Sequence, residues 1–548
     1  MGLRLRMKKK LADRLETTHE PGTSAISKML TNVITPIYNL RRRILLSAVF
    51  LLYVVISGYA ICHHEPWTDE VRSWNIAKGS NTYADMIFNR RYEGHPLGWY
   101  TILWSISKFT HNTDYMKAAQ WLLAVTVVFV ILFLSPFPLR TRIMIPFGYY
   151  FLFEYAILSR NYAIGVLPVL CICYILRQDF KYKTVLYYAL LFCITNTHLL
   201  AAILAGSLHI YYLLWNAENK RKVWPHVLAG ILVFLPAVYF IFPPSDNQLN
   251  MHSWLSRWSI HQAAALQEEV PLRAFLPIPA WWDYHFWNTE FLLTAKKVYY
   301  PLKLIAPLLS VALIVLGGFI LKRSKKSLAL YIANVLVNAI VASFFQFEAA
   351  ARYSGFIYIG FITAYWLYCY EFPIRSVSLD GAPSARPRLF ASPVWLVNLL
   401  LLVQLAAGAF AIYKDIRLPF SNIYRISEMA KEVPPDKRLV TDYWTMNGYV
   451  AFMDKPAYCI DAWKNMSFVT WGEDIPLLTS TPNRYSSGLK DLFSHQRTDS
   501  VYLVSQGSLQ QLFKIDPQLP QSFHISVVDK MEGAIEKESN LYLYLIRP

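Results

Sequence analysis

Long apolar runs separated by short polar segments dominate the chain between residues 43 and 413. A helix needs about 20 mostly apolar residues to cross roughly 30 Å of hydrocarbon. The longer runs are 43–62, 116–135, 224–243, 300–321, 327–346, 352–371 and 392–413, and the shorter ones are 143–158, 161–177, 184–197 and 199–215. None of them alternates as a barrel strand would, and lipid tolerates only helices or closed barrels. The pattern therefore predicts a polytopic α-helical membrane protein, with about 11 transmembrane helices and an upper bound of about 13.

The hydrophobic pattern changes after residue 413. The remaining segment of roughly 135 residues is long enough for one small domain. It shows helical patterns at 420–433 and 444–453, and strand patterns at 438–441, 457–460, 501–504, 525–528 and 541–545. Such a mixture is typical of layered folds, so we expect residues 414–548 to form an α/β domain. The segment has no Gly-rich phosphate loop and no triad signature, which favours acceptor binding over a second chemistry.

Composition agrees with a membrane protein, because 55% of the residues are hydrophobic and only 16% are charged. A formal net charge of +17 would also suit a nucleic-acid-binding protein, but the positions of the charges argue against that. Lys and Arg cluster in residues 1–43, 177–183, 220–222, 322–326 and 375–388, in short segments beside apolar runs. Segments of this kind stay in the cytoplasm. The basic residues therefore indicate topology and contact with anionic lipid, not with nucleic acid.

Applied along the chain, the positive-inside rule gives eleven crossings. Residues 1–42 become a basic cytoplasmic segment, and the run 43–62, which is not followed by a signal-peptide cleavage site, is expected to remain as an anchor. Three segments then face outside the inner (cytoplasmic) membrane: the loop 63–96, the loop 244–299 and the C-terminal domain 414–548. Segment 97–109 has no crossing in this map, and an alternative map shifts a crossing between residues 97 and 158.

The loop 63–96 carries the most unusual chemistry. Asp69 and Glu70 are adjacent carboxylates beside a tryptophan, and His95-Pro96 ends the loop before the chain becomes apolar again. At a membrane surface this pair favours a catalytic or cation-binding group that a lipid-borne substrate can reach. The alternative is that both are solvated loop charges, or helix-start residues favoured by the helix dipole.

The topology map brings further polar residues to the same membrane face. Glu154, Arg160, His198 and Arg352 lie within or at the ends of apolar runs, where polar side chains are costly and frequently functional. Taken singly, each arginine fits an interface anchor, His198 fits a helix cap, and Glu154 fits an ion-pair partner of Arg160. Their common placement with Asp69 favours a single site.

The order of these motifs resembles that of the GT-C-fold glycosyltransferases, especially the bacterial relatives of protein O-mannosyltransferases and of lipid A aminoarabinose transferases. The resemblance covers roughly residues 40–370. It implies that Asp69 is the general base and Glu70 its neighbour in the loop. It matches His95 to the family's His-Pro-Pro element, and Arg160 with Tyr162 to its Ala-Arg-x-Tyr element.

Two positions depart from the family pattern. Leu97 stands where the second proline is expected, and Leu158 with Ser159 replaces an acid that commonly precedes the arginine. The resemblance implies transfer of a sugar from a polyprenyl-phosphate carrier to an acceptor hydroxyl of a protein, lipid or glycan outside the cytoplasmic membrane. The donor, the acceptor and membrane lipid are the expected partners.

The residue types agree with that chemistry. Asp69 can accept the acceptor's proton, and Glu70 can orient the acceptor or a cation. Arg160 and Arg352 can bind phosphate oxygens with two donors each. A divalent ion held by Asp69, Glu70 and His95 is a further option, because carboxylates and imidazole are suitable ligands. The sequence has no compact metal-ligand spacing, so no cofactor is certain.

Two rival functions use the same features. A transporter or flippase of a lipid-linked or anionic substrate would place ionisable residues near helix midpoints, whereas these lie at one end. A non-catalytic scaffold for the exported domain leaves the acids of the loop unexplained.

The loop 244–299 has tryptophans at 254, 258, 281, 282 and 287. They fit either helices lying in the interface over the carrier lipid or an ordinary aromatic belt.

Overall fold

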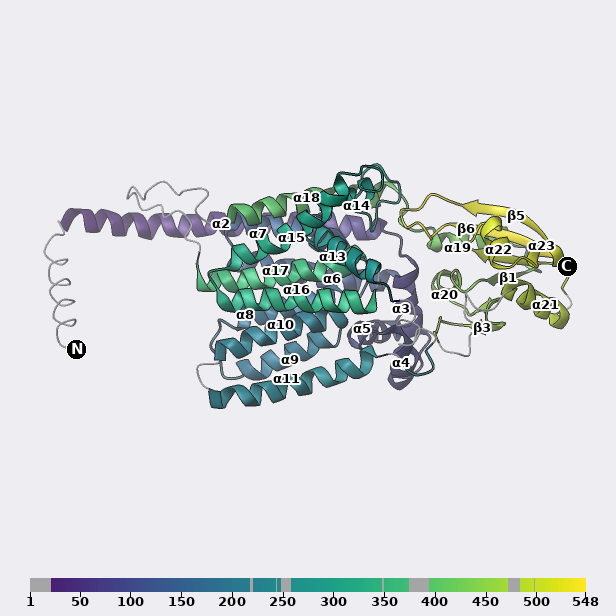
Figure 1. Cartoon of the computed structure of the whole chain (residues 1–548), viewed down its shortest axis with the longest axis horizontal. Coiled ribbons are helices and arrows are strands. Elements are labelled where there is room, and N and C mark those ends of the chain that lie inside the picture. Colours follow the sequence, from purple (N-terminus) through teal and green to yellow (C-terminus); the bar gives the residue numbers. More distant parts are fainter. Residues whose placement is uncertain are drawn as a thin grey trace.

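A computed structural model describes residues 21–216, 220–242, 244–247, 258–346, 349–373, 394–471, 483–496 and 498–548. The chain is mostly helical, and its C-terminal part contains one mixed sheet. In Figure 1 the long helices lie side by side, and the sheet lies beyond one end of them. The predictions for residues 1–20, for Trp254 and for the basic segment 375–388 fall outside the described residues.

Seven helices among the described residues are long and apolar enough to cross a membrane. They are α2 (Pro21–His63, apolar from Leu40), α6 (Asp114–Phe129, continued by the π-helix η3 over Val130–Leu134), α10 (Leu199–Asn216), α11 (Lys220–Ile241), α15 (Leu302–Leu321), α16 (Lys325–Phe345) and α18 (Val394–Arg417). Two shorter apolar helices are α8 (Ala163–Ile175) and α9 (Lys183–Thr195). The chain is a multi-pass membrane protein, as the apolar pattern predicts.

Helix α17 (Ala351–Glu371) is as long as these helices but lies buried among them along nearly its whole length. It packs against α16, and also against α13 (Ile260–Phe275), which belongs to the predicted loop 244–299. Close packing on α17 requires small residues. A Cβ added at Gly355 would lie 2.3 Å from the Tyr155 hydroxyl oxygen. A side chain at that position would push α17 away from the segment that precedes Arg160.

The apolar range 143–158, predicted as one crossing, is not a continuous helix. It contains the end of α7 (Leu139–Met144), the 3-10 turn η4 (Ile145–Phe147) and the π turn η5 (Tyr150–Glu154). Pro146 lies in the turn, and Gly148 is extended with φ −70° and ψ 155°. Helix α18 crosses the chain here so closely that a Cβ on Gly408 would lie 2.7 Å from the Phe147 carbonyl oxygen. Proline and the close backbone approach explain the break.

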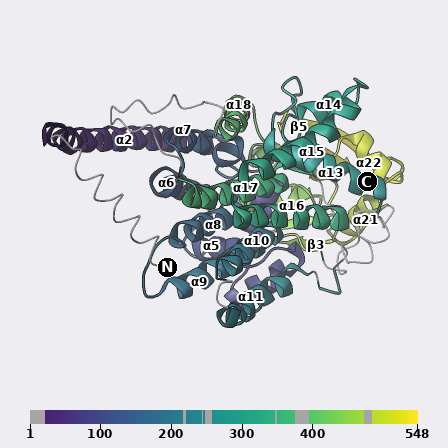
Figure 2. The same cartoon turned by 60° about the vertical axis from the view of Figure 1, so that its left-hand side comes forward.

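The loop 63–96 and the segment after it fold into short helices between the long helices and the sheet (Figure 1). In the view of Figure 2 the C-terminal domain, in yellow, lies behind the long helices. These are α3 (Thr68–Lys78), α4 (Tyr83–Asn89), the 3-10 helix η2 (Arg90–Glu93) and α5 (Gly98–Ser107). Segment 97–109 is therefore a ten-residue helix. Its buried Trp99 and Leu103 pack with Trp74 and Ala77 of α3. This apolar contact holds α3 from one side.

The C-terminal sheet has the strand order β3-β2-β1-β4-β6-β5. The strands are β1 (Arg438–Thr441), β2 (Ala457–Cys459), β3 (Lys464–Met466), β4 (Val501–Ser505), β5 (His524–Met531) and β6 (Leu541–Arg547). Strand β1 pairs in parallel with β2 and β4, and the remaining neighbours are antiparallel. The five predicted strands are confirmed, and β3 is the strand that the pattern missed.

Helices cover both faces of the sheet, because alternate residues of a strand point to opposite faces. On β4, Val501 and Leu503 pack with α21 (Arg484–Gln496), α22 (Leu509–Ile515) and α23 (Leu519–Ser522), while Val504 packs with α19 (Ile426–Met429) and α20 (Met446–Met453). The domain is a layered α/β fold, as predicted. The helix expected over 420–433 is present from Ile423 to Glu432, as a 3-10 turn, the short α-helix α19 and a second 3-10 turn in succession.

The C-terminal domain docks on α3 and its surroundings. The Asn75 side chain donates to the Asn447 carbonyl (2.8 Å), and Lys78 donates to the Val450 carbonyl (2.9 Å) of α20. Where α18 ends, the Phe420 amide donates to the Glu65 carboxylate (2.8 Å). The sheet domain is thereby held against the helix that carries Asp69.

Candidate functional site

Asp69 is the second residue of α3. A hydrogen bond within the first turn fixes the start of that helix. The Glu70 carboxylate accepts a hydrogen bond from the Trp67 amide (3.0 Å), which satisfies one of the free donors at the helix start. The Asp69 side chain retains 31% of its surface exposed. Nη2 of Arg160 lies 3.8 Å from Oδ2 of Asp69, and Nη1 donates to the Asp69 carbonyl (2.6 Å). An accessible carboxylate is thus held beside a buried guanidinium.

Three arginines surround Asp69. Arg72, Arg160 and Arg352 are all buried, and each interacts electrostatically with the Asp69 carboxylate. Arg352 lies in the first turn of α17, with Cζ 5.2 Å from the centre of the Trp67 ring. Within the described part of the chain, the buried Nε atoms of Arg160 and Arg352 have no hydrogen-bond partner. Such donors suit an anion with several oxygens.

Arg352 is positioned by contacts to its backbone. The Tyr155 hydroxyl donates to the Arg352 carbonyl (2.8 Å), and the Ala351 amide donates to the Asn288 side chain (3.2 Å). Asn288 adopts the left-handed conformation with φ 59°, which asparagine tolerates better than most residues. The loop 244–299 therefore caps the helix that carries Arg352.

His95 and His198 lie close to these arginines. Burial and the charges of Arg160 and Arg72 lower the pKa of His95 to about 3, so its ring is neutral at neutral pH. His198 accepts a hydrogen bond from the Ala201 amide (3.3 Å), which is the cap contact considered from the sequence. Its Nε2 is buried without a hydrogen-bond partner in the described ranges. Both histidines therefore offer neutral donors or acceptors.

Glu154 and Tyr162 lie in a group of buried residues rich in aromatic rings, here called the aromatic floor, which includes Tyr155, Tyr162 and Phe356. The ion pair between Glu154 and Arg160 considered from the sequence is not formed. Glu154 accepts hydrogen bonds from the Tyr149 hydroxyl (2.9 Å) and from Trp287 Nε1 (3.3 Å). The turn η5 directs the carboxylate to these partners, which come from its own turn and from the loop 244–299.

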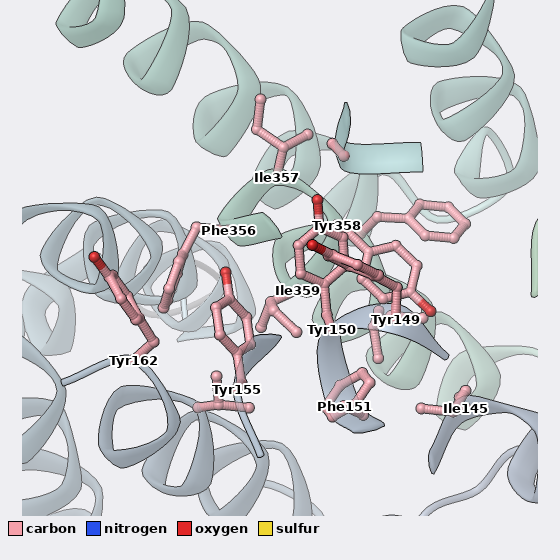
Figure 3. Packing of buried hydrophobic residues seen from close by; sticks show 14 of the residues in the cluster. Ile145, Tyr149, Tyr150, Phe151, Tyr155, Tyr162, Phe356, Ile357, Tyr358 and Ile359 are labelled. Carbon is pink, nitrogen blue, oxygen red and sulfur yellow. The ribbon is translucent and has the colours of Figure 1, made fainter. Parts of the chain in front are cut away.

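The ring of Tyr162 stacks on Tyr155, with ring centres 5.7 Å apart, and His198 packs against it edge-on at 5.1 Å. Figure 3 shows the rings of Tyr155, Tyr162 and Phe356 close together in this floor. The Tyr162 hydroxyl is buried and has no hydrogen-bond partner among the described residues. Packing on Tyr155 and His198 fixes the ring.

Glu70 does not lie where its predicted role requires. It is fully buried, and its Oε2 is 3.1 Å from Nε2 of His64, whose Nδ1 is 3.0 Å from Asp415 on α18. Its Oε1 accepts from the Ser159 amide (2.5 Å), next to Arg160 in the chain. Glu70 therefore positions the loop instead of orienting an acceptor or a cation.

His64 bridges two buried carboxylates. Burial alone would lower the pKa of His64, but Asp415 and Glu70 outweigh that effect and raise it to about 10. Both ring nitrogens then carry protons and donate to carboxylates, which only accept. The imidazolium joins the end of α2, the start of α3 and the last turn of α18.

Sequence reasoning missed this bridge and also missed Arg72. His64 is the second residue after the first apolar run, and Asp415 is an acid in the last turn of an apolar helix. These positions are the only local signal of either residue. Arg72 lies three residues after Asp69, on a neighbouring face of α3. It pairs with Glu93, and its Cζ lies 4.5 Å above the centre of the Trp471 ring. Arg72 thereby links the Asp69 region to the C-terminal domain.

The divalent-ion option does not fit this geometry. Asp69 faces Arg160, whereas Glu70 faces His64 and Ser159, so these carboxylates do not converge with His95. In the ranges that the structure describes, no group of three or more His, Cys, Asp or Glu residues is placed to hold a metal ion. We assign no step to a metal.

Comparison with known proteins adds no identification: no protein-family model matches the chain, and no curated protein sequence matches it. An accessible carboxylate, partly unpaired guanidiniums, neutral histidines and an aromatic floor can bind an anion and accept a proton beside it.

Proposed function

We propose that the protein transfers a sugar from a polyprenyl-phosphate carrier to an acceptor hydroxyl at the extracytoplasmic face of the membrane. The observation that supports this most directly is the accessible Asp69 carboxylate beside Arg160, with Arg352 nearby and a buried donor unpaired on each arginine. The donor is amphipathic, with an apolar chain and an anionic phosphate. A protein that binds it needs apolar helices and cationic donors at the end of them.

The arginines are suited to the phosphate. A guanidinium offers two parallel N–H donors to phosphate oxygens and stays charged at any physiological pH. Arg352 lies at the start of α17, which Tyr155 and Asn288 hold in place, and Arg160 lies in the bend before α8, where it donates to the Asp69 carbonyl and to Ser73. Because neither arginine needs to move, their charge is available when negative charge grows on the leaving phosphate.

Asp69 is suited to the acceptor. As the acceptor oxygen forms its bond to the anomeric carbon, the bond from that carbon to the phosphate oxygen breaks, and the hydroxyl proton passes to Asp69. Polyprenyl phosphate leaves with the electron pair, and its charge is held by Arg160 and Arg352. His95 is neutral at neutral pH and can hydrogen-bond to hydroxyl groups without adding charge.

The orientation follows from the charge distribution. The basic segments 177–183, 220–222 and 322–326 lie in the cytoplasm under the positive-inside rule. Asp69, Arg160, Arg352 and the C-terminal domain are then extracytoplasmic. This orientation fits a carrier that presents its sugar outside the cell membrane.

Replacing Asp69 by Asn tests the proposal, because Asn keeps the size of the side chain and cannot accept the proton. We expect transfer from polyprenyl-phosphate sugars in proteoliposomes to fall by roughly 10²–10⁴-fold, with donor binding unchanged. Asp114→Asn is the matched control, because Asp114 is 70% exposed at the start of α6. Cell-envelope glycans from a deletion strain carrying each variant, analysed by mass spectrometry, give the same comparison in cells.

Two results would contradict the proposal. Transfer by Asp69→Asn at the wild-type rate would remove the base. Donor movement across the bilayer without sugar transfer by the wild type would identify a flippase instead.

A further inference from the structure

A segment of the C-terminal domain follows the face of α3 that leads to Asp69. A Cβ added at Gly79 would lie 2.7 Å from the Phe468 ring, and Trp471 covers Arg72 seven residues earlier on α3. Seven helical residues span about 10 Å, and three residues of extended chain also cover about 10 Å. The segment from Phe468 to Trp471 therefore runs antiparallel to α3, from its end back towards the site.

A cavity of about 540 Å³ lies beside this segment. One wall comes from α3, α4 and η2, with Gly79, Asn89 and Tyr92, and the other from the C-terminal domain, with Lys464, Ser467 and Thr470. Its size is within the range of roughly 300–1,000 Å³ that ligand sites occupy. Thr470 adjoins Trp471, so the cavity begins where the cover over Arg72 ends.

The walls combine aromatic faces with hydrogen-bonding groups. Phe88, Tyr92 and Phe468 supply rings, and Arg91 lies over one face of Phe88 and of Tyr92. Asn89 and Thr470 supply an amide and a hydroxyl, and the lining also contains the charged residues Arg91, Asp246 and Lys464. A sugar ring has one face of C–H bonds that packs on aromatic rings and a rim of hydroxyls that hydrogen-bond to such groups. An acyl chain would cover the charged groups of Arg91, Asp246 and Lys464 without offering them hydrogen bonds, which is costly.

The distance to Asp69 defines the length of the ligand. Asp69 and Gly79 are ten residues apart on α3, which is about 15 Å along the helix axis. A molecule that offers a hydroxyl to Asp69 and also fills the cavity must span that distance. A single sugar is too short, whereas a chain of several sugars reaches both places.

We propose that this cavity binds the distal part of an oligosaccharide acceptor, so that the C-terminal domain selects the acceptor. The assignment rests on the proposed glycosyltransferase function. Arg72 connects the two regions through its contacts with Glu93 and Trp471. Residues Phe468–Trp471 lie between the cavity and the Asp69 region, over Arg72.

Filling the cavity from either wall tests the assignment. Thr470→Trp and Asn89→Trp add bulk from the C-terminal domain and from α4, and Ser494→Trp on an exposed part of α21 is the control. The full-length protein is tested in nanodiscs with polyprenyl-phosphate hexose and pentose donors. The acceptor probe is the water-soluble oligosaccharide fraction that mild acid releases from envelopes of a deletion strain. Donor hydrolysis by water, measured without oligosaccharide, reports on the donor site alone.

We expect both cavity variants to lower transfer to the oligosaccharides by at least about tenfold at subsaturating acceptor, with donor hydrolysis as in the wild type. Transfer by both variants at the wild-type rate would refute the acceptor site and leave the proposed function standing. Modification of a peptide fraction in place of the oligosaccharides would overturn the carbohydrate assignment. A wild type that neither hydrolyses nor transfers from any donor would refute the proposed function itself.

Discussion

The imidazolium bridge at His64 is open to a quantitative test. His64→Gln keeps much of the side-chain volume but donates to only one of the two carboxylates, Glu70 or Asp415. Because the pKa of His64 is raised to about 10 from an ordinary value near 6.5, the charged form stabilises the fold by roughly 5 kcal/mol at about 1.4 kcal/mol per pKa unit. Breaking a buried ion pair costs a similar amount, about 3–5 kcal/mol.

The pH dependence has a definite sign. A group whose pKa is higher in the folded state contributes its full stabilisation below its unfolded pKa and loses it as the pH rises through the folded value. The contribution of His64 is therefore complete below about pH 6.5 and declines by roughly 1.4 kcal/mol per pH unit towards pH 10. At pH 8.5, about 3 kcal/mol of it has been lost.

The measurement is equilibrium unfolding in mixed detergent micelles, followed by tryptophan fluorescence between pH 6 and pH 10. The control is His63→Gln, because His63 is exposed and hydrogen-bonds only to the Tyr59 carbonyl of its own helix among the described residues. We expect His63→Gln to change the free energy of unfolding by less than about 0.5 kcal/mol. The difference between wild type and His64→Gln should shrink as the pH rises. A difference that does not change with pH, or a loss no larger than that of His63→Gln, would refute the bridge.

Three further predictions concern the site and the topology. Arg160→Lys and Arg352→Lys should each slow sugar transfer, because lysine keeps the charge but loses paired donation; wild-type rates in both would identify the arginines as membrane anchors. The pKa of His95 is lowered to about 3, so the pH–rate profile should have no inflection near pH 6.5 from this residue. The free energy of unfolding should fall as the pH falls from about 6.5 to 3, because His95 binds a proton in the unfolded chain but not in the folded chain. Unfolding of wild type and His95→Asn as a function of pH measures this, and an equal slope in both would contradict it. A single cysteine at exposed position 494, in a cysteine-free background, should react with a membrane-impermeant maleimide in intact spheroplasts, and protection there would invalidate the topology map.

The parts of the fold that the sequence predicts well are those whose pattern is local. Apolar runs of membrane length became helices, and the alternating strands β1, β4 and β6 were found near their observed bounds. Strand β3 escaped prediction because Lys464–Met466 is short and mostly polar, and it is held only by pairing with β2. The range 143–158 was misjudged because hydropathy does not report a proline turn or the close approach of α18 at Gly148.

The candidate site shows the same division. Sequence reasoning named Asp69, His95, Arg160 and Arg352 from their place at the ends of apolar runs, and the structure brings them into one region. It could not find the contact between His64 and Asp415, because 351 positions separate them and neither carries a motif. Long-range polar pairs of this kind are set by tertiary packing, which no local period encodes.

Adjacent residues need not share a task, and Asp69 with Glu70 illustrates why. Successive residues of an α-helix point about 100° apart, so a pair that is contiguous in sequence diverges in space. Glu70 turns inward, where His64, Trp67 and Ser159 use both of its oxygens, while Asp69 turns towards Arg160 and keeps part of its surface exposed. The buried acid fixes the helix start and the backbone beside Arg160. The partly exposed acid, placed by that framework beside Arg160, remains available for the proposed role of base.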